Sequence, residues 1–126
     1  MALPAKLQND LKQFQRLQQE LALVDQQRAQ VDMKLRETTQ ALDEIKGLPE
    51  DAILYRPVGG ILVRAKSRQE IEDILGEEKE TLEVRLRALE RQVTHLKERY
   101  QSMQKELSAS LQAAGVGVVE GDEGSS

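Results

Sequence analysis

The sequence predicts a mainly α-helical fold, a long antiparallel two-helix coiled coil with a single β-hairpin between the helices. Apolar residues recur at alternating steps of four and three over two long segments, a pattern typical of coiled-coil seams. Between these segments lie short β-prone runs around a Pro/Gly turn. The 126 residues contain no Trp, one Phe and two Tyr, too few aromatic side chains for a thick globular core.

The first periodic segment predicts a helix over residues 5–46. Its seam runs through Leu17, Leu21, Val24, Arg28, Val31, Leu35, Thr38, Leu42 and Ile45. Upstream, the apolar face continues with a slip in spacing, as a stutter would give, through Leu3, Leu7, Leu11 and Phe14. Pro4 or Ala5 suits the helix start and Gly47 suits its end.

The second segment predicts a helix over residues 68–112. Its seam follows a strict four-three alternation through Leu75, Lys79, Leu82, Leu86, Leu89, Val93, Leu96, Tyr100, Met103 and Leu107. Ser67 and Glu70 form the pattern of a capping box at its start. Gly76 lies inside the helix and marks a soft point. Arg28, Thr38 and Lys79 interrupt the two seams and either specify register or, for the long side chains, extend to solvent.

Helices of matched length joined by about twenty residues fold back antiparallel, since a short connection favours neighbouring helices. This arrangement places Phe14 near Tyr100 and Leu7 near Leu107. We therefore expect one helix–hairpin–helix domain over residues 1–112. The Gly-rich, acidic segment 113–126 is expected to be a disordered tail.

The connection predicts a β-hairpin over residues 53–65, with runs at 53–55 and 61–65 around a turn at 56–60. An isolated hairpin is marginal in water, so we expect strands of other subunits to complete it. The alternative is that the hairpin folds down as a cap on the helix ends. The residues expected to carry assembly are Ile53, Leu54, Tyr55, Val58, Ile61, Leu62 and Val63.

With these features in place, the sequence resembles the beta-type subunits of prefoldin, and its Gln-rich first helix resembles archaeal members. The resemblance covers nearly the whole chain. It is most specific in Leu48-Pro49-Glu50-Asp51-Ala52, in Tyr55, Val58-Gly59 and Ile61-Leu62-Val63, and in the helix that carries residues 80–86 and 89–92. A single hairpin is the feature that distinguishes the beta type from the alpha type, which has two.

The resemblance implies a chaperone subunit of a hexamer with two alpha-type and four beta-type subunits. Such a complex holds unfolded proteins at the coiled-coil tips, prevents their aggregation and passes them to a group II chaperonin without ATP. In this chain the frayed end of the coiled coil would supply the client-binding residues. They are Leu3, Leu7, Leu11, Phe14, Met103, Leu107 and Leu111, of which several could instead only zip the helices together.

Composition argues against other functions. Basic and acidic residues are interspersed, with a net charge of −4, so nucleic acid is not an expected partner. No apolar run is long enough to span a membrane, and the lack of cysteine fits the cytoplasm. His95 stands alone and the acidic residues near Glu80 suit helix surface pairs, so we expect no catalytic site, metal or cofactor.

Two functions of other classes remain as alternatives. A structural coiled-coil scaffold or tether would assemble through the same hairpin and use its helices only as spacers. A helical arm that grips tRNA is disfavoured by the acidic balance of the chain.

Overall fold

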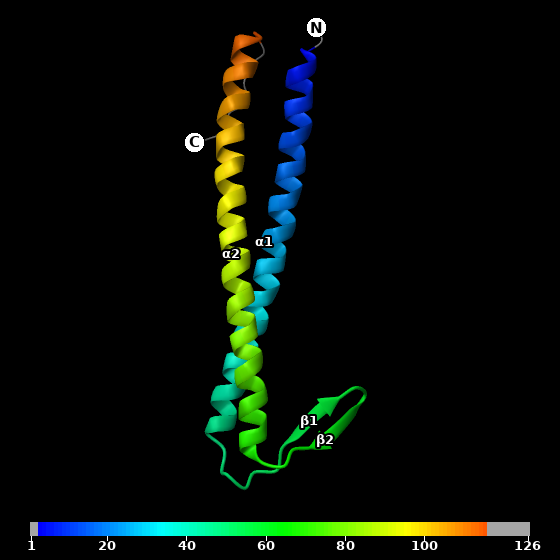
Figure 1. The fold of residues 1–126 in the computed structure, drawn as a ribbon, viewed down its shortest axis with the longest axis vertical. Helices are drawn as coiled ribbons and strands as arrows, with labels where there is room; N and C mark the ends of the chain where they lie inside the picture. Colours follow the sequence, from blue (N-terminus) through cyan, green and yellow to red (C-terminus); the bar gives the residue numbers. More distant parts are fainter. Residues whose placement is uncertain (1–2, 116–126) are drawn as a thin grey trace. The chain divides into compact units, whose positions relative to one another are not determined.

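The computed structural model describes residues 3–115 of the chain. Helix α1 (Ala5–Lys46) is followed by strands β1 (Tyr55–Val58) and β2 (Ile61–Arg64) and by helix α2 (Arg68–Ala113) (Figure 1). The chain forms two compact units. The hairpin unit comprises residues 27–89, and the terminal unit comprises the described residues 3–26 and 90–115. Each helix contributes to both units. Of the tail expected over residues 113–126, Ala113 is the last residue of α2, and residues 116–126 lie outside the described residues.

The terminal unit packs the first part of α1 against the last part of α2. Its buried apolar side chains are Leu7, Leu17, Val24, Val93, Leu96 and Leu107. Phe14 and Tyr100 stack with ring centroids 4.9 Å apart and an interplanar angle of 23°. Aromatic pairs at this separation add stability beyond the area they bury. The stack confirms the predicted neighbourhood of these two rings and with it the antiparallel pairing of the helices.

The hairpin unit has a narrow apolar core with one polar member. Its buried apolar side chains are Val31, Leu42, Ala65, Ile71 and Leu89. Thr38 is only 4% exposed, and its Oγ1 donates a hydrogen bond to Glu78 Oε2 at 3.3 Å. Lys34 Nζ approaches the same oxygen at 3.8 Å. Because this hydroxyl has a partner in the opposite helix, Thr38 favours the observed register of α1 against α2.

The two strands form an antiparallel pair in the register Tyr55↔Arg64 through Val58↔Ile61. This register corrects the predicted turn, because Arg56, Pro57 and Val58 belong to β1 and only Gly59 and Gly60 connect the strands. Gly59 has φ = 61° at the first central position, as in a type II′ turn that matches the strand twist. Pro57 is tolerated in β1 because its nitrogen lies on the free edge of the sheet.

The start of α2 is held by side chains of its first turn. Ser67 Oγ accepts a hydrogen bond from the Glu70 backbone N–H at 3.2 Å. Glu70 Oε1 in turn accepts from the Lys66 backbone N–H at 3.0 Å. The predicted capping box is therefore present, although Glu70 reaches the residue before the cap rather than the cap itself.

Gly76 provides a test of the helix assignment. A Cβ atom added at Gly76 would meet no other atom within 4 Å, so alanine fits there without strain. We expect Gly76→Ala to raise the free energy of unfolding by about 1 kcal/mol, because alanine loses less backbone entropy in a helix. Ala88→Gly, on the exposed surface of α2, should lower it by a similar amount. Urea unfolding followed by circular dichroism measures both changes, and a destabilised Gly76→Ala variant would contradict the assignment.

Candidate assembly and client-binding surfaces

The hairpin carries most of the strongly exposed apolar side chains of its unit. Leu62 is 70% exposed, Ile61 65% and Tyr55 57%. Ile53 and Val58 are also exposed, whereas Leu54 and Val63 are half-buried. A cap folded onto the helix ends would cover these side chains, and in the described hairpin they face solvent. Exposure of this kind marks an interaction surface.

The hairpin presents apolar residues on both of its faces. Residues paired across the strands share a face because side chains alternate along each strand. One face carries Tyr55, Pro57, Leu62 and Arg64, and the other carries Arg56, Val58, Ile61 and Val63. Burial of the apolar side chains of the hairpin therefore requires contacts on both of its faces.

One ion pair ties the hairpin to the start of α2. Arg56 Nε lies 3.3 Å from Glu70 Oε2, while Oε1 of the same carboxylate caps the helix. Arg68 adds a second link, since its guanidinium donates to the Leu48 carbonyl oxygen and to Glu72 Oε2. These contacts link Leu48, just after α1, and Arg56 of β1 to the first turn of α2. The sequence pattern revealed the capping role of Glu70 but not its pairing with Arg56, which depends on the fold.

The terminal unit contains all seven residues predicted to bind clients. Leu7 and Leu107 are buried in its core. The other five are half-buried and keep part of their side chains accessible: Leu3, Leu11, Phe14, Met103 and Leu111. The surface available to a client is therefore a row of partly open apolar side chains, with Leu7 and Leu107 beneath it.

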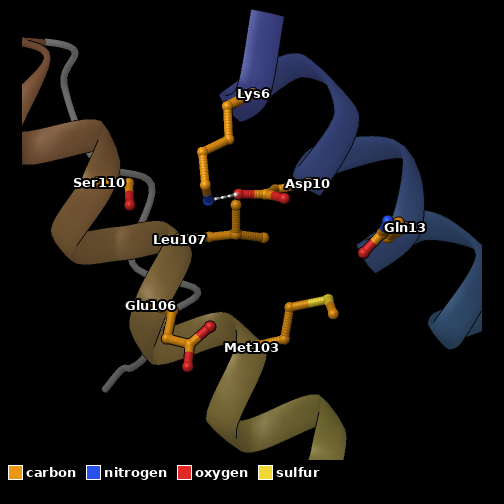
Figure 2. Close-up of a pocket in the computed structure, with 7 residues that line it drawn as sticks. All are labelled: Lys6, Asp10, Gln13, Met103, Glu106, Leu107 and Ser110. Carbon is orange, nitrogen blue, oxygen red and sulfur yellow. Dashed lines mark hydrogen bonds and ion pairs between the residues drawn. The ribbon is translucent and has the colours of Figure 1, made fainter. Parts of the chain in front are cut away.

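A cavity of about 150 Å³ opens beside this row (Figure 2). Met103 and Leu107 point toward α1 at its apolar side, and Lys6 extends from α1 to Asp10. Lys6 Nζ lies 2.9 Å from Asp10 Oδ2. The hydrogen bond and the charge of Asp10 raise the pKa of Lys6, and Glu106 adds a smaller electrostatic contribution.

The remaining lining of this cavity is polar, with Gln13, Glu106 and Ser110. Sequence reasoning selected only the apolar members of this group. The spacing of Lys6 and Asp10 at i and i+4 signals their ion pair, but nothing in the sequence places the pair beside Met103. A second, more open hollow of about 330 Å³ is lined by Gln18, Leu21, Ala22, Asp25, Lys97 and Tyr100.

The described residues contain no group of three or more His, Asp or Glu side chains that could hold a metal ion. His95 lies exposed on α2. Among the same residues, no helix is both long and apolar enough to cross a membrane.

Comparison with known proteins agrees with this geometry. A family model described as "Prefoldin subunit" matches residues 8–114. The chain belongs to the beta-subunit family of prefoldin. The prefoldin beta subunit of Archaeoglobus fulgidus is 44% identical over 109 residues, which cover 86% of this chain and 93% of the relative. That of Thermococcus kodakarensis is 44% identical over 112 residues, covering 89% and 92%.

A solved structure extends the similarity to three dimensions. The crystal structure of the prefoldin beta subunit from Thermococcus strain KS-1 matches with a TM-score of 0.80 and 40% identity, covering 87% of this chain and 96% of that chain. The predicted fold class, two long packed helices with one two-stranded hairpin between them, is thereby confirmed. Prefoldin is a family of non-enzymatic chaperones, so membership implies a chaperone function within a prefoldin complex.

The ion pair between Arg56 and Glu70 generates a prediction about hairpin mobility. We expect Arg56→Ala to accelerate hydrogen exchange of the hairpin amides up to about fivefold, because a partly exposed ion pair contributes at most about 1 kcal/mol. Arg36→Ala is the matched control, since Arg36 pairs with Asp32 inside α1 at 3.1 Å. Unchanged hairpin exchange in Arg56→Ala, or equal acceleration in the control, would show that the pair does not restrain the hairpin.

Proposed function

We propose that this chain is a subunit of a hetero-hexameric, ATP-independent chaperone that binds unfolded proteins in its terminal unit and prevents their aggregation. Its hairpin joins alpha-type subunits and further beta subunits, and the complex passes its clients to a group II chaperonin. The observation that carries the proposal is the division of exposed apolar surface between a hairpin suited to assembly and a terminal unit suited to capture. The lack of cysteine supports a cytoplasmic location.

The row of partly exposed residues in the terminal unit suits clients without a fixed shape. Apolar contact is non-directional, and it needs no specific sequence in the client. Met103 is flexible and polarizable, so it adapts to different side chains. Leu3 and Leu111 lie near the helix ends, where local unfolding costs least. Fraying there would uncover Leu7 and Leu107 as well.

Weak contacts at several subunits account for both capture and release. One chain offers few apolar side chains, so a single contact is short-lived. Subunits joined through their hairpins hold several such sites close together, and the effective concentration raises the overall affinity. Since each contact still breaks individually, a client can move to another chaperone without any chemical step.

The scaffold alternative draws support from one observation, the burial of Leu7 and Leu107 between the helices. If the remaining five residues serve only to zip the helices together, the terminal unit has no client surface. The two functions differ in their effect on unfolded proteins.

The deciding experiment dilutes a denatured model enzyme into buffer that contains this protein and its alpha-type partner, without ATP. Suppression of light scattering at near-stoichiometric complex supports client capture. Aggregation that proceeds unchanged in the presence of a well-formed oligomer favours the scaffold.

Truncation tests the placement of the client surface. Removing the residues before Leu11 and after Leu107 should leave assembly intact and abolish suppression of aggregation, because Leu3 and Leu111 at the helix ends are lost together with the underlying Leu7. Leu23→Ser provides a control, since Leu23 is an exposed apolar residue of α1 outside the proposed surface. Sedimentation verifies the oligomer, and full protection by the truncated complex would refute this placement.

Substitution in the hairpin tests the assembly surface. The double variant Ile61→Asp and Val63→Asp should dissociate the complex and leave the helices folded, because it places two charges on one face of β2. Val84→Asp alters an exposed apolar residue of α2 in the same unit and should leave the complex intact. Sedimentation velocity and circular dichroism report the two properties, and an intact double-variant complex would remove the hairpin as the assembly device.

A further inference from the structure

The cavity of Figure 2 has the size of one side chain. Its volume is about 150 Å³, and all seven lining residues belong to the terminal unit. A protein cavity of about this volume accommodates a benzene molecule. It is therefore too small for a helix or a strand of a partner, and it fits a single side chain of an unfolded chain.

The lining of the cavity is apolar on one side and polar elsewhere. Met103 and Leu107 form the apolar side, and Leu107 extends from α2 toward the pair of Lys6 and Asp10 on α1 (Figure 2). Methylene groups pack favourably against such side chains. A matching occupant thus has an apolar stem and a polar end.

The charges around the cavity are unbalanced. It is lined by one positive side chain, Lys6, and by two negative ones, Asp10 and Glu106, so one negative charge is in excess. Lys6 is held by Asp10 at 2.9 Å. Within residues 3–115, none of the ion pairs includes Glu106, which attracts Lys6 only at longer range. The start of α1 and the end of α2 carry opposite partial charges that offset each other, so Glu106 sets the sign of the local field.

We propose that this cavity binds arginine side chains of unfolded clients. The inference rests on the proposed capture of clients in the terminal unit and names the client chemistry that this surface prefers. The methylene groups of the arginine lie against Met103 and Leu107, and its guanidinium group donates to the carboxylate of Glu106. A guanidinium group matches a carboxylate with two parallel hydrogen bonds.

Other client side chains fit this cavity less well. A lysine ammonium group is more strongly hydrated than a guanidinium group and has no planar pair of donors. An acidic side chain is repelled by Glu106, and a purely apolar one would remove water from this carboxylate without replacing its hydrogen bonds. The second hollow is lined by one acidic and one basic residue, Asp25 and Lys97, so its lining has no such charge preference.

The cavity lies beside the row of partly exposed apolar residues, so it acts together with them. A client segment in which arginine adjoins leucine or phenylalanine can place the arginine in the cavity and its apolar neighbour on the row. Segments of this composition should therefore be captured in preference to equally apolar segments without arginine.

The test compares two labelled unfolded peptides that differ only in charge. One contains leucine–arginine pairs separated by glycine and serine, and in the other citrulline replaces every arginine. Citrulline keeps the length and nearly the shape of arginine but is neutral. Fluorescence anisotropy measures the dissociation constant of each peptide with the complex of this chain and its alpha-type partner, at low ionic strength and without ATP.

We expect the wild-type complex to bind the arginine peptide about threefold more tightly or better, since an exposed ion pair contributes little alone and several segments act together. Glu106→Gln should abolish the preference. Lys6→Gln should increase it, because Asp10 then adds an unopposed negative charge. Glu98→Gln is the matched control, since Glu98 is an exposed acidic residue of α2 that does not line the cavity.

Methionine methyl groups report where the arginine binds. In a complex with ¹³C-labelled methionine methyl groups, the arginine peptide should shift the NMR resonance of Met103 more than the citrulline peptide does. Met33, which is 64% exposed in the hairpin unit, should respond to neither. An unchanged Met103 resonance in the presence of bound arginine peptide would overturn the placement.

Several affinity results would also overturn the inference. They are equal binding of the two peptides by the wild-type complex, a preference that persists in Glu106→Gln, and an equal loss of preference in Glu98→Gln. A complex that suppresses aggregation without any preference for arginine refutes the inference and leaves the proposed function standing. A well-formed complex that binds neither peptide and does not suppress aggregation refutes both.

Discussion

A two-stranded sheet cannot satisfy its own backbone, and this constraint governs the molecule. Among the described residues the sheet has no third strand to pair with the outward N–H and carbonyl groups of β1 and β2, and apolar side chains lie exposed on both of its faces. The helices cannot compensate, because their apolar stripes are used in packing against each other. Association with other chains is thus the remaining way to bury the hairpin, and the proposed capture of clients at several weak sites would require such association.

The helices and their pairing could be predicted from the sequence because a coiled-coil seam is a local, repeating signal. Each apolar position constrains its neighbours three and four residues away, so the pattern tolerates exceptions such as Thr38. Matched helix lengths then fixed the register well enough to place Phe14 beside Tyr100, which stack at 4.9 Å. The sequence left the role of Thr38 open, and the structure gives its buried hydroxyl the hydrogen-bond partner that a buried polar group requires.

Features that depend on the pairing of residues far apart in the sequence could not be predicted from the sequence. The sequence pattern placed Pro57 in the turn. It belongs to β1, where the strand pairing turns its nitrogen toward the free edge of the sheet. Glu70 reads as a cap, and its second partner Arg56 appears only when β1 returns toward α2. In the terminal unit, Met103 and Leu107 occupy equivalent heptad positions and both line the cavity of Figure 2, yet they differ in exposure. Leu107 is buried, whereas Met103 is half-buried. Heptad spacing does not encode this difference, which arises from the packing of individual side chains.

If unfolded proteins bind the terminal unit and not simply any exposed apolar side chain, crosslinking from defined positions will reveal it. A photo-crosslinking amino acid can be placed at Leu3 or Leu111, and in separate variants at Met33 or Val84, which are 64% and 60% exposed in the hairpin unit. Each variant is assembled with the alpha-type subunit and illuminated with a denatured client. The account predicts client adducts at Leu3 and Leu111 and few at Met33 and Val84. Equal labelling at all four positions, or adducts confined to the hairpin unit, would contradict it.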